Sequence, residues 1–142
     1  MAAGSWQFVA SARRNLINGT FDIDSDTWFM SLLASTGVMA ASTNDPFTGV
    51  SAQEVATAST GYASAAVNLL MTGTNPVTVD ISTDPVWTAT TNGFTARYAV
   101  IHESGGNILC YAPLESNSTD VIITTGNTLT VAAASSGVFS LS

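Results

Sequence analysis

Residues 98–111 have the sequence YAVIHESGGNILCY, and this stretch decides the fold class. On both sides of Gly105-Gly106 the pattern fits a β-strand, in which successive side chains point to opposite faces. If the two glycines form a two-residue turn, the stretch folds into an antiparallel hairpin that places Ile101 opposite Cys110. The stretch therefore predicts two neighbouring antiparallel strands.

The predicted hairpin is apolar on both of its faces. One face carries Tyr98, Val100, Leu109 and Tyr111, and the other carries Ala99, Ile101, Ile108 and Cys110. A hairpin that is apolar on both sides is covered either by a second layer of the same chain or by another protein subunit. Both alternatives are open at this point, and Tyr98, Val100 and Tyr111 are candidate interface residues.

Further short strands surround the hairpin. Period-two alternation recurs in residues 21–24, 77–81 and 128–131, and residues with high turn propensity separate these stretches. Many short strands joined by frequent turns are typical of an antiparallel sandwich or barrel. Because 142 residues leave room for one core only, we expect an all-β fold with a single β-sandwich domain over residues 15–142.

Two local patterns give more specific predictions. Asn92-Gly93 favours a tight hairpin turn, which would place Trp87 opposite Tyr98. Residues 51–54, with the sequence SAQE, fit a capping box and predict a short helix or a structured loop.

Residues 1–14 lie outside this rhythm of strands. They combine the apolar side chains of Trp6, Phe8 and Val9 with the basic pair Arg13-Arg14. The segment is either an N-terminal arm that reaches another subunit or a first strand that packs on the domain's own sheet. As an arm, it would anchor through the three apolar side chains, while the two arginines would pair with acidic groups of a partner.

The composition is unusually poor in charge. Only 9% of the residues are charged, against roughly 25% in an ordinary globular domain, while 46% are hydrophobic. A soluble monomer usually carries abundant mixed charge, so a surface made of Ser, Thr, Asn and Gly favours partial burial in an assembly. The alternative is a monomer kept soluble by its hydroxyl groups and its net charge of -7.

The same composition argues against two classes of partner. The chain has no lysine and only three arginines, Arg13, Arg14 and Arg97, so it lacks a basic surface that would bind nucleic acid. Its apolar stretches, such as residues 28–34, are far shorter than a membrane span, and no basic segment precedes an apolar run as in a signal peptide. We therefore expect neither nucleic acid nor a membrane as partner.

Catalytic groups are scarce. His102 is the single histidine and Cys110 the single cysteine. In the predicted hairpin His102 lies opposite Leu109 and points away from Cys110, so the two side chains do not form a catalytic dyad. We expect that the chain is not an enzyme and that His102 has a structural role.

A candidate metal loop also fails on inspection. Residues 22–26, with the sequence DIDSD, resemble the start of a calcium-binding loop. However, Thr27 stands at the sixth position in place of glycine, and Leu33 at the twelfth in place of glutamate. We expect a turn here, with no metal ion and no cofactor bound to the chain.

Three segments, taken together, carry a family resemblance. They are NGTFDID at 18–24 leading into the apolar residues 28–33, TGY at 60–62, and VWTA at 86–89 leading into TARYAVI at 95–101. The chain then closes on GVFSL at 137–141. In this order and spacing they resemble small virion proteins of tailed bacteriophages, of the head decoration or cement type.

The resemblance implies a jelly-roll-like fold and a place on the capsid exterior of the virion. It implies a capsid decoration protein that forms a dimer or trimer, binds the major capsid protein and stabilises contacts between its subunits. A tail, fibre or receptor-binding component of the virion is the alternative, and an enzyme comes third. The expected architecture is thus an antiparallel, jelly-roll-like sandwich with an N-terminal arm.

Overall fold

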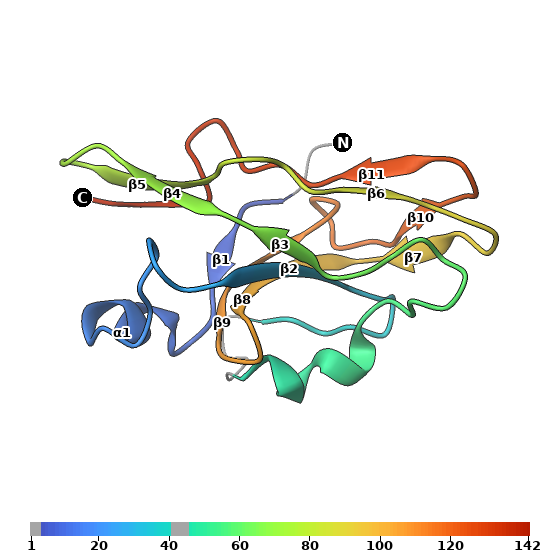
Figure 1. Ribbon diagram of the computed structural model, residues 1–142, viewed down its shortest axis with the longest axis horizontal. Coiled ribbons are helices and arrows are strands. Elements are labelled where there is room, and N and C mark those ends of the chain that lie inside the picture. The colour runs from blue at the N-terminus through green and yellow to red at the C-terminus, as the bar shows by residue number, and fades with distance from the viewer. Residues whose placement is uncertain (1–3, 41–45) are drawn as a thin grey trace.

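The computed structural model describes residues 4–40 and 46–142, and short strands dominate this part of the chain (Figure 1). The strands pair in the antiparallel sense, which confirms the predicted all-β class. The bounds of the elements are β1 Gln7–Phe8, α1 Ala12–Ile17, β2 Trp28–Leu33, η1 Phe47–Gly49, η2 Ser51–Gln53, β3 Ala65–Val67, β4 Leu69–Thr72, β5 Val77–Ile81, β6 Val86–Thr88, β7 Phe94–Ala96, β8 Tyr98–Glu103, β9 Ile108–Pro113, β10 Val121–Ile123, β11 Thr128–Thr130 and β12 Phe139–Leu141.

The largest sheet has five strands in the order β1-β9-β8-β2-β3. At its centre β2 and β8 pair along their whole length, from Trp28 opposite Glu103 to Leu33 opposite Tyr98. Every residue of β9 is buried, as expected for a strand that is apolar on both faces. The chain itself supplies this cover: β4, β5, β6 and β11 lie on one side of the sheet, and α1 with the 3₁₀ turns lies on the other (Figure 1).

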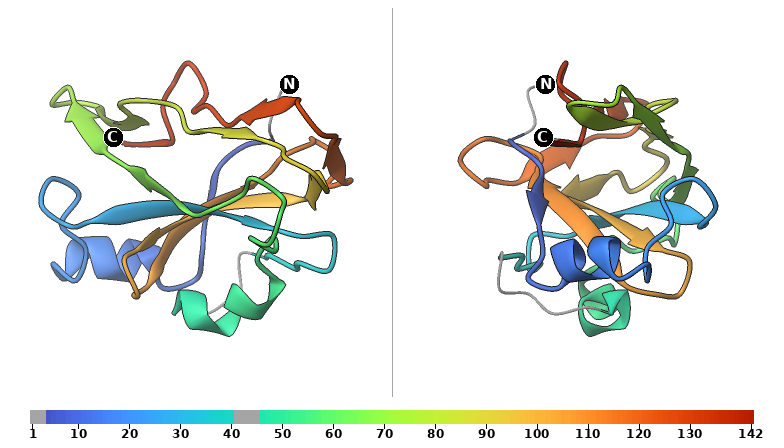
Figure 2. Two further views of the ribbon diagram at one scale, coloured as in Figure 1. Left: turned by 45° about the vertical axis from the view of Figure 1, so that its right-hand side comes forward. Right: turned by 90° about the vertical axis from the view of Figure 1, so that its left-hand side faces the viewer.

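From residue 77 to residue 141 the strand pairs nest within one another. The hairpin β8-β9 is innermost, followed outward by β7-β10, β6-β11 and β5-β12. The outer pairs keep a nearly continuous register, with Phe94 opposite Ile123, Val86 opposite Thr130 and Leu141 opposite Val77. This part of the chain is therefore one long antiparallel ribbon folded over the main sheet (Figure 2).

Two extended stretches pass from one sheet to another. β3 pairs with β2 in the main sheet, whereas β4 pairs with β5, and only Asn68 separates β3 from β4. Arg97 likewise separates β7, which pairs with β10, from β8 in the main sheet. Strands that change sheets form the corners of packed β layers, so these two residues join the layers at their edges.

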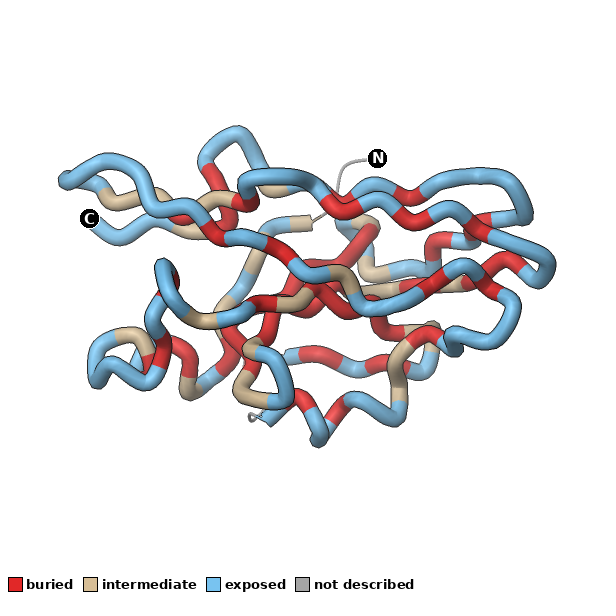
Figure 3. The backbone as a smooth tube through the Cα atoms, in the orientation of Figure 1, coloured by how far each residue is buried: buried red, intermediate tan, exposed pale blue. Residues whose placement is uncertain are grey.

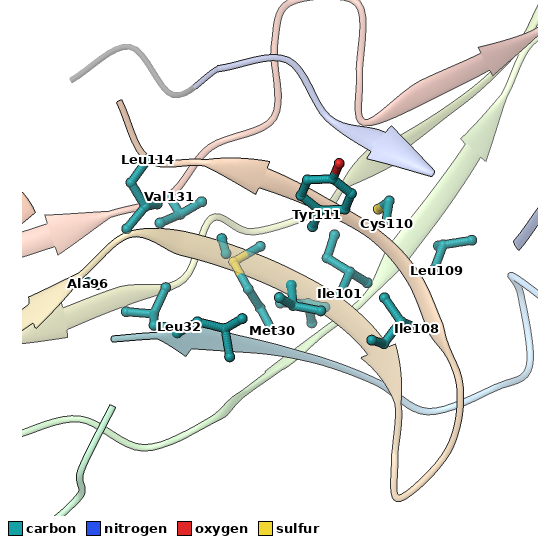
Figure 4. Packing of buried hydrophobic residues seen from close by; sticks show 14 of the residues in the cluster. Met30, Leu32, Ala96, Ile101, Ile108, Leu109, Cys110, Tyr111, Leu114 and Val131 are labelled. Atoms are coloured by element: carbon teal, nitrogen blue, oxygen red, sulfur yellow. The ribbon is translucent and has the colours of Figure 1, made fainter. Parts of the chain in front are cut away.

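A hydrophobic cluster fills the space between the layers (Figure 4). Its fully buried side chains include Met30 and Leu32 of β2, Ile101 of β8, and Ile108 and Leu109 of β9. Burial of one such side chain stabilises the fold by about 1.5–3 kcal/mol. Buried residues follow the central strands, while exposed residues mark the loops and the outer ends of the ribbon (Figure 3).

The turn of the central hairpin differs from the prediction. Ile101 lies opposite Cys110 as predicted, but His102 lies opposite Ile108 instead of Leu109. The cause is a shift of register between Ile101 and His102, which leaves Leu109 as an additional residue in β9. The predicted alternation of faces therefore holds from the outer ends of the hairpin as far as Ile101 and Cys110.

The predicted pairing of Trp87 with Tyr98 is wrong. Trp87 lies opposite Leu129 of β11, because the turn at Asn92-Gly93 is followed by β7, whose partner is β10. Pairing with a distant strand overrides the local hairpin signal here. The prediction for residues 51–54 is met by the short turn η2, although no side chain caps it, and α1 had no counterpart in the predictions.

Candidate functional site

The N-terminal segment forms an edge strand of the main sheet. In β1, Gln7 lies opposite Tyr111 and Phe8 opposite Cys110. The structure thus supports the first-strand alternative over residues 4–14 and shows no free arm there; the first three residues lie outside the described part. β1 is the last strand of its sheet, so its outer edge has no strand partner among the described residues.

One face of the sheet beside β1 carries an aromatic pair. The rings of Tyr98 and Tyr111 meet edge to face with their centroids 6.1 Å apart, and the Tyr111 hydroxyl donates to Oε1 of Gln7 at 3.2 Å. Burial raises the pKa of Tyr111, with a further contribution from Tyr98, so the phenol stays neutral at physiological pH. The structure brings these two predicted interface residues together and adds Gln7, which the sequence analysis missed.

The other face carries a stack that joins two ends of the chain. The guanidinium carbon of Arg13 lies 4.9 Å from the centroid of the Phe8 ring, and the Phe8 ring lies 4.7 Å from the Phe139 ring. A cation placed over an aromatic face is attracted by the ring's electron density. Arg13 and Phe8 were both predicted as interface residues, whereas Phe139 comes from β12 and no local pattern pointed to it.

The side chains on the two faces beside β1 together form a surface that we call the β1 edge. Its members are Trp6, Gln7, Phe8, Arg13, Tyr98, Tyr111 and Phe139. Trp6, Phe8, Tyr98 and Phe139 are half-buried in the isolated chain. Arg13 and Arg14 are exposed, as their predicted role in contacts with a partner requires.

Three of the predicted interface residues belong to the core. Val9 and Val100 are completely buried within the chain, so neither side chain is available to a partner in this conformation. For Val100 the reason is the second layer over the hairpin, which covers the apolar surface that the sequence left unassigned. Tyr111 is buried as well, and its part in the β1 edge is to support Tyr98 and Gln7.

His102 lies in a buried polar site that the sequence did not reveal. Its Nε2 lies 3.0 Å from Oγ of Ser31, and its Nδ1 lies 2.7 Å from the carbonyl oxygen of Glu103. The imidazole stacks on the Phe47 ring with a centroid distance of 3.8 Å. Because alternate residues of β8 face opposite ways, His102 points away from Ile101 and its partner Cys110, as the sequence analysis predicted.

The polar site continues from Ser31 to the segment between η2 and β3. Ser31 Oγ lies 2.7 Å from Ser64 Oγ, and both Ser64 and Tyr62 donate hydrogen bonds to Oε1 of Glu54, at 2.6 Å and 2.5 Å. The backbone N–H of Leu32 in turn donates to the Tyr62 hydroxyl at 2.9 Å. The network therefore links the segment between η2 and β3 to β2.

A serine hydroxyl beside a histidine nitrogen is also the geometry of a nucleophile and its base. In this chain, however, the Ser31 side chain is fully buried, and Ser64 occupies its second hydrogen-bonding direction. Burial lowers the pKa of His102, although the bond to Glu103 and the charge of Glu54 oppose that effect. The hydroxyl is thus closed to a substrate in this conformation, and its contacts serve to hold elements together.

The acidic residues at 22–26 form a turn. Oδ1 of Asp22 accepts hydrogen bonds from the backbone N–H groups of Asp24 and Ser25, and Oδ2 of Asp26 accepts one from the N–H of Asp22. Within the described residues no group of three or more His, Cys, Asp or Glu side chains is placed to hold a metal ion. In the same part of the chain, no helix has the length and apolar character needed to cross a membrane.

Comparison of the chain with protein-family models, with curated proteins and with solved structures finds no match.

Proposed function

We propose that this chain is a bacteriophage capsid decoration protein. In this role it binds the outer surface of the head and stabilises contacts between subunits of the major capsid protein. The observation that carries the proposal is the β1 edge, a strand edge that has no partner strand among the described residues and is flanked by aromatic side chains and by the exposed Arg13. The order of the segments that resemble head decoration proteins supports the same role.

The nested strand pairs support a jelly-roll-like description of the fold. A jelly roll is an antiparallel ribbon of paired strands wound into two layers, and it occurs in viral capsid proteins, lectins and cupins. Here β5-β12, β6-β11, β7-β10 and β8-β9 form four successive pairs of one ribbon. Because one fold serves many functions, the likeness to a jelly roll supports the proposal only together with the properties of the β1 edge.

The surface of the chain is suited to contact with other proteins. Apolar side chains stand well exposed at Ile17, Val38, Leu70, Val86, Ile122 and Leu141, while charged residues make up only 9% of the sequence. Of the three arginines, Arg97 is held by Asp120 at 2.7 Å. Arg13 and Arg14 therefore remain for acidic groups of other protein subunits.

Binding through the β1 edge has a simple physical basis. An extended segment of a capsid subunit can pair with the free edge of β1, which supplies main-chain hydrogen bonds, while aromatic side chains supply buried area. The net charge of -7 would disfavour adsorption of the protein to packaged DNA. The phage tail offers the alternative location for the same type of contact.

The copy number of this chain in purified heads and in isolated tails decides between these locations. Quantitative mass spectrometry of both fractions is expected to find many copies in heads and none in tails. The opposite distribution would establish the tail, fibre or receptor-binding alternative and reject the capsid role.

A binding assay tests the β1 edge directly. Heads assembled without this chain are mixed with the purified protein and sedimented, and the bound fraction gives the affinity. The variant Arg13→Gln is expected to bind several-fold more weakly, because a charge-assisted contact with the shell is lost. Arg97→Gln, at an arginine that is already paired with Asp120 within the chain, serves as the control for loss of a positive charge; equal affinity of the two variants would show that the β1 edge is not the binding surface.

A further inference from the structure

A groove of about 320 Å³ lies between the sheet β12-β5-β4 and the segment that leads from α1 into β2. One wall is the inner face of the sheet, where Met71, Val79 and Phe139 form a row of opposed residues. The other wall includes Leu16 and Phe21. In Figure 2 the outer ends of β4 and β5 lie toward the same end of the molecule as α1.

A protruding apolar side chain lies directly beside the groove. Ile17, at the end of α1, has 89% of its surface exposed, while the preceding Leu16 lines the groove. Arg14 lies three residues before Ile17 and is also exposed, so the two side chains share one side of the helix. A projecting isoleucine with an adjacent arginine thus adjoins an apolar hollow.

The charges of the two features are complementary. Asp22 forms part of the groove wall and is exposed, and its carboxylate is held in the ionised form chiefly by the Ser25 side chain, which lowers its pKa. Among the described residues no arginine pairs with Asp22. Arg97 is bound to Asp120 and Arg13 lies over Phe8, which leaves Arg14 as the arginine outside such contacts in the described part of the chain.

We infer that the occupant of the groove is a second copy of this chain, related by a two-fold axis. Ile17 of each copy enters the groove of the other, and Arg14 of each copy pairs with Asp22 of its partner. A two-fold interface uses the same patch on both subunits, which requires the projecting group and its hollow to lie side by side. Leu16 and Ile17 meet this requirement, because Leu16 lines the groove and Ile17, the next residue, projects from the surface.

This self-association does not depend on the proposed capsid role, because it can be measured with the purified protein alone. Sedimentation equilibrium across a wide range of concentrations is expected to show a monomer–dimer equilibrium. A protein that remains monomeric at every concentration, while still binding heads, would overturn the inference and leave the capsid proposal standing.

Matched variants locate the contact. Ile17→Ser is expected to weaken the dimer at least tenfold, whereas Ile122→Ser, at an apolar side chain that is 72% exposed on β10, leaves it unchanged. Neither side chain is part of the core, so both variants are expected to fold. Equal dimer affinity of the two variants would overturn the placement of Ile17 in the groove.

A double-mutant cycle tests the charge pair. Asp22→Asn keeps the acceptor oxygen that the turn at residues 22–26 uses, and removes only the charge. Arg14→Gln and Asp22→Asn are each expected to weaken the dimer about five- to tenfold, and their combination to weaken it no further. If the two effects simply multiply, Arg14 and Asp22 do not pair across the interface and the proposed arrangement is wrong.

Discussion

Nε2 of His102 lies 3.0 Å from the hydroxyl oxygen of Ser31, although 71 positions separate the two residues in the chain. The Nδ1 atom faces the carbonyl oxygen of Glu103 at 2.7 Å, and since a carbonyl oxygen only accepts, Nδ1 carries a proton. Phe47 covers the ring by stacking on it. The ring is thus buried, and a positive charge on it would lie away from water.

The stability of the fold is expected to fall on acidification through His102. Burial, the largest contribution, lowers the pKa of His102 from its ordinary value of 6.5, so the unfolded chain binds a proton more readily than the folded chain. The contribution of the neutral ring is complete above pH 6.5 and is lost as the pH falls through the lowered pKa. Urea denaturation at a series of pH values from above to below this range measures the effect.

His102→Gln provides the control for that measurement. Glutamine is uncharged at every pH, so the variant is expected to be less stable near neutral pH and to lose the part of the acid sensitivity that the wild type owes to His102. Because the chain has one histidine, the imidazole signals in NMR report this titration without overlap. An unchanged pH dependence in the variant would contradict the prediction.

Removal of the Ser31 hydroxyl is expected to destabilise the fold. In Ser31→Ala the Nε2 atom of His102 loses its partner inside the protein, at an expected cost of about 1–3 kcal/mol in the free energy of unfolding. Chemical denaturation measures this difference. Ser140→Ala, at an exposed position of β12, is expected to change stability by less than about 0.5 kcal/mol; a comparable loss in both variants would argue against the role of the network.

The two buried tyrosines are expected to respond differently to loss of their hydroxyl groups. Tyr62→Phe leaves the backbone N–H of Leu32 without its partner and removes one of the two hydrogen bonds to Oε1 of Glu54, which is expected to cost about 1–3 kcal/mol. Tyr111→Phe removes one longer bond to Gln7 and is expected to cost below about 1 kcal/mol. Thermal and chemical unfolding of both variants measure the order, and a larger loss for Tyr111→Phe would refute it.

Two glycines of the ribbon separate backbone strain from crowding. Both Gly137 and Gly126 have a positive φ, 82° and 83°, where a residue with a Cβ atom costs about 1–2 kcal/mol. A Cβ atom at Gly137 would also lie 2.5 Å from the carbonyl oxygen of Val79. A Cβ atom at Gly126 would have no neighbouring atom within 4 Å. Gly137→Ala is therefore expected to destabilise the fold more than Gly126→Ala in denaturation experiments, and equal losses would mean that strain alone acts.

The sequence predicted the class of the fold well and the strand partners poorly. Alternation of side chains identified residues 98–111 as two strands, and the pair Ile101–Cys110 is present in the structure. Trp87 was placed opposite Tyr98 because the turn at Asn92-Gly93 is a strong local signal, yet its partner is Leu129. Local turn propensity does not indicate which distant strand will pair with β6 and help to bury Trp87. That burial decided the partner of Trp87.

The candidate interface was predicted in part for the same reason. Arg13 and Phe8 are close in sequence, and their contact follows from the local chain path, but Phe139 joins them from the other end of the chain. Val100 was a candidate because its hairpin is apolar on both faces, and the second layer places it in the core. The sequence alone identifies the apolar residues. The packing of the layers determines which of them remain exposed to a partner.

The hairpin at residues 98–111 shows this division most clearly. Its alternating pattern by itself determined that the protein is built from antiparallel strands, because side-chain period is a property of the local backbone. Only the tertiary structure decided that the chain covers both faces of the hairpin, that His102 meets Ser31, and that β1 has no outer partner strand within residues 4–40 and 46–142. These features depend on contacts between residues far apart in sequence, which form only when the ribbon folds over the main sheet.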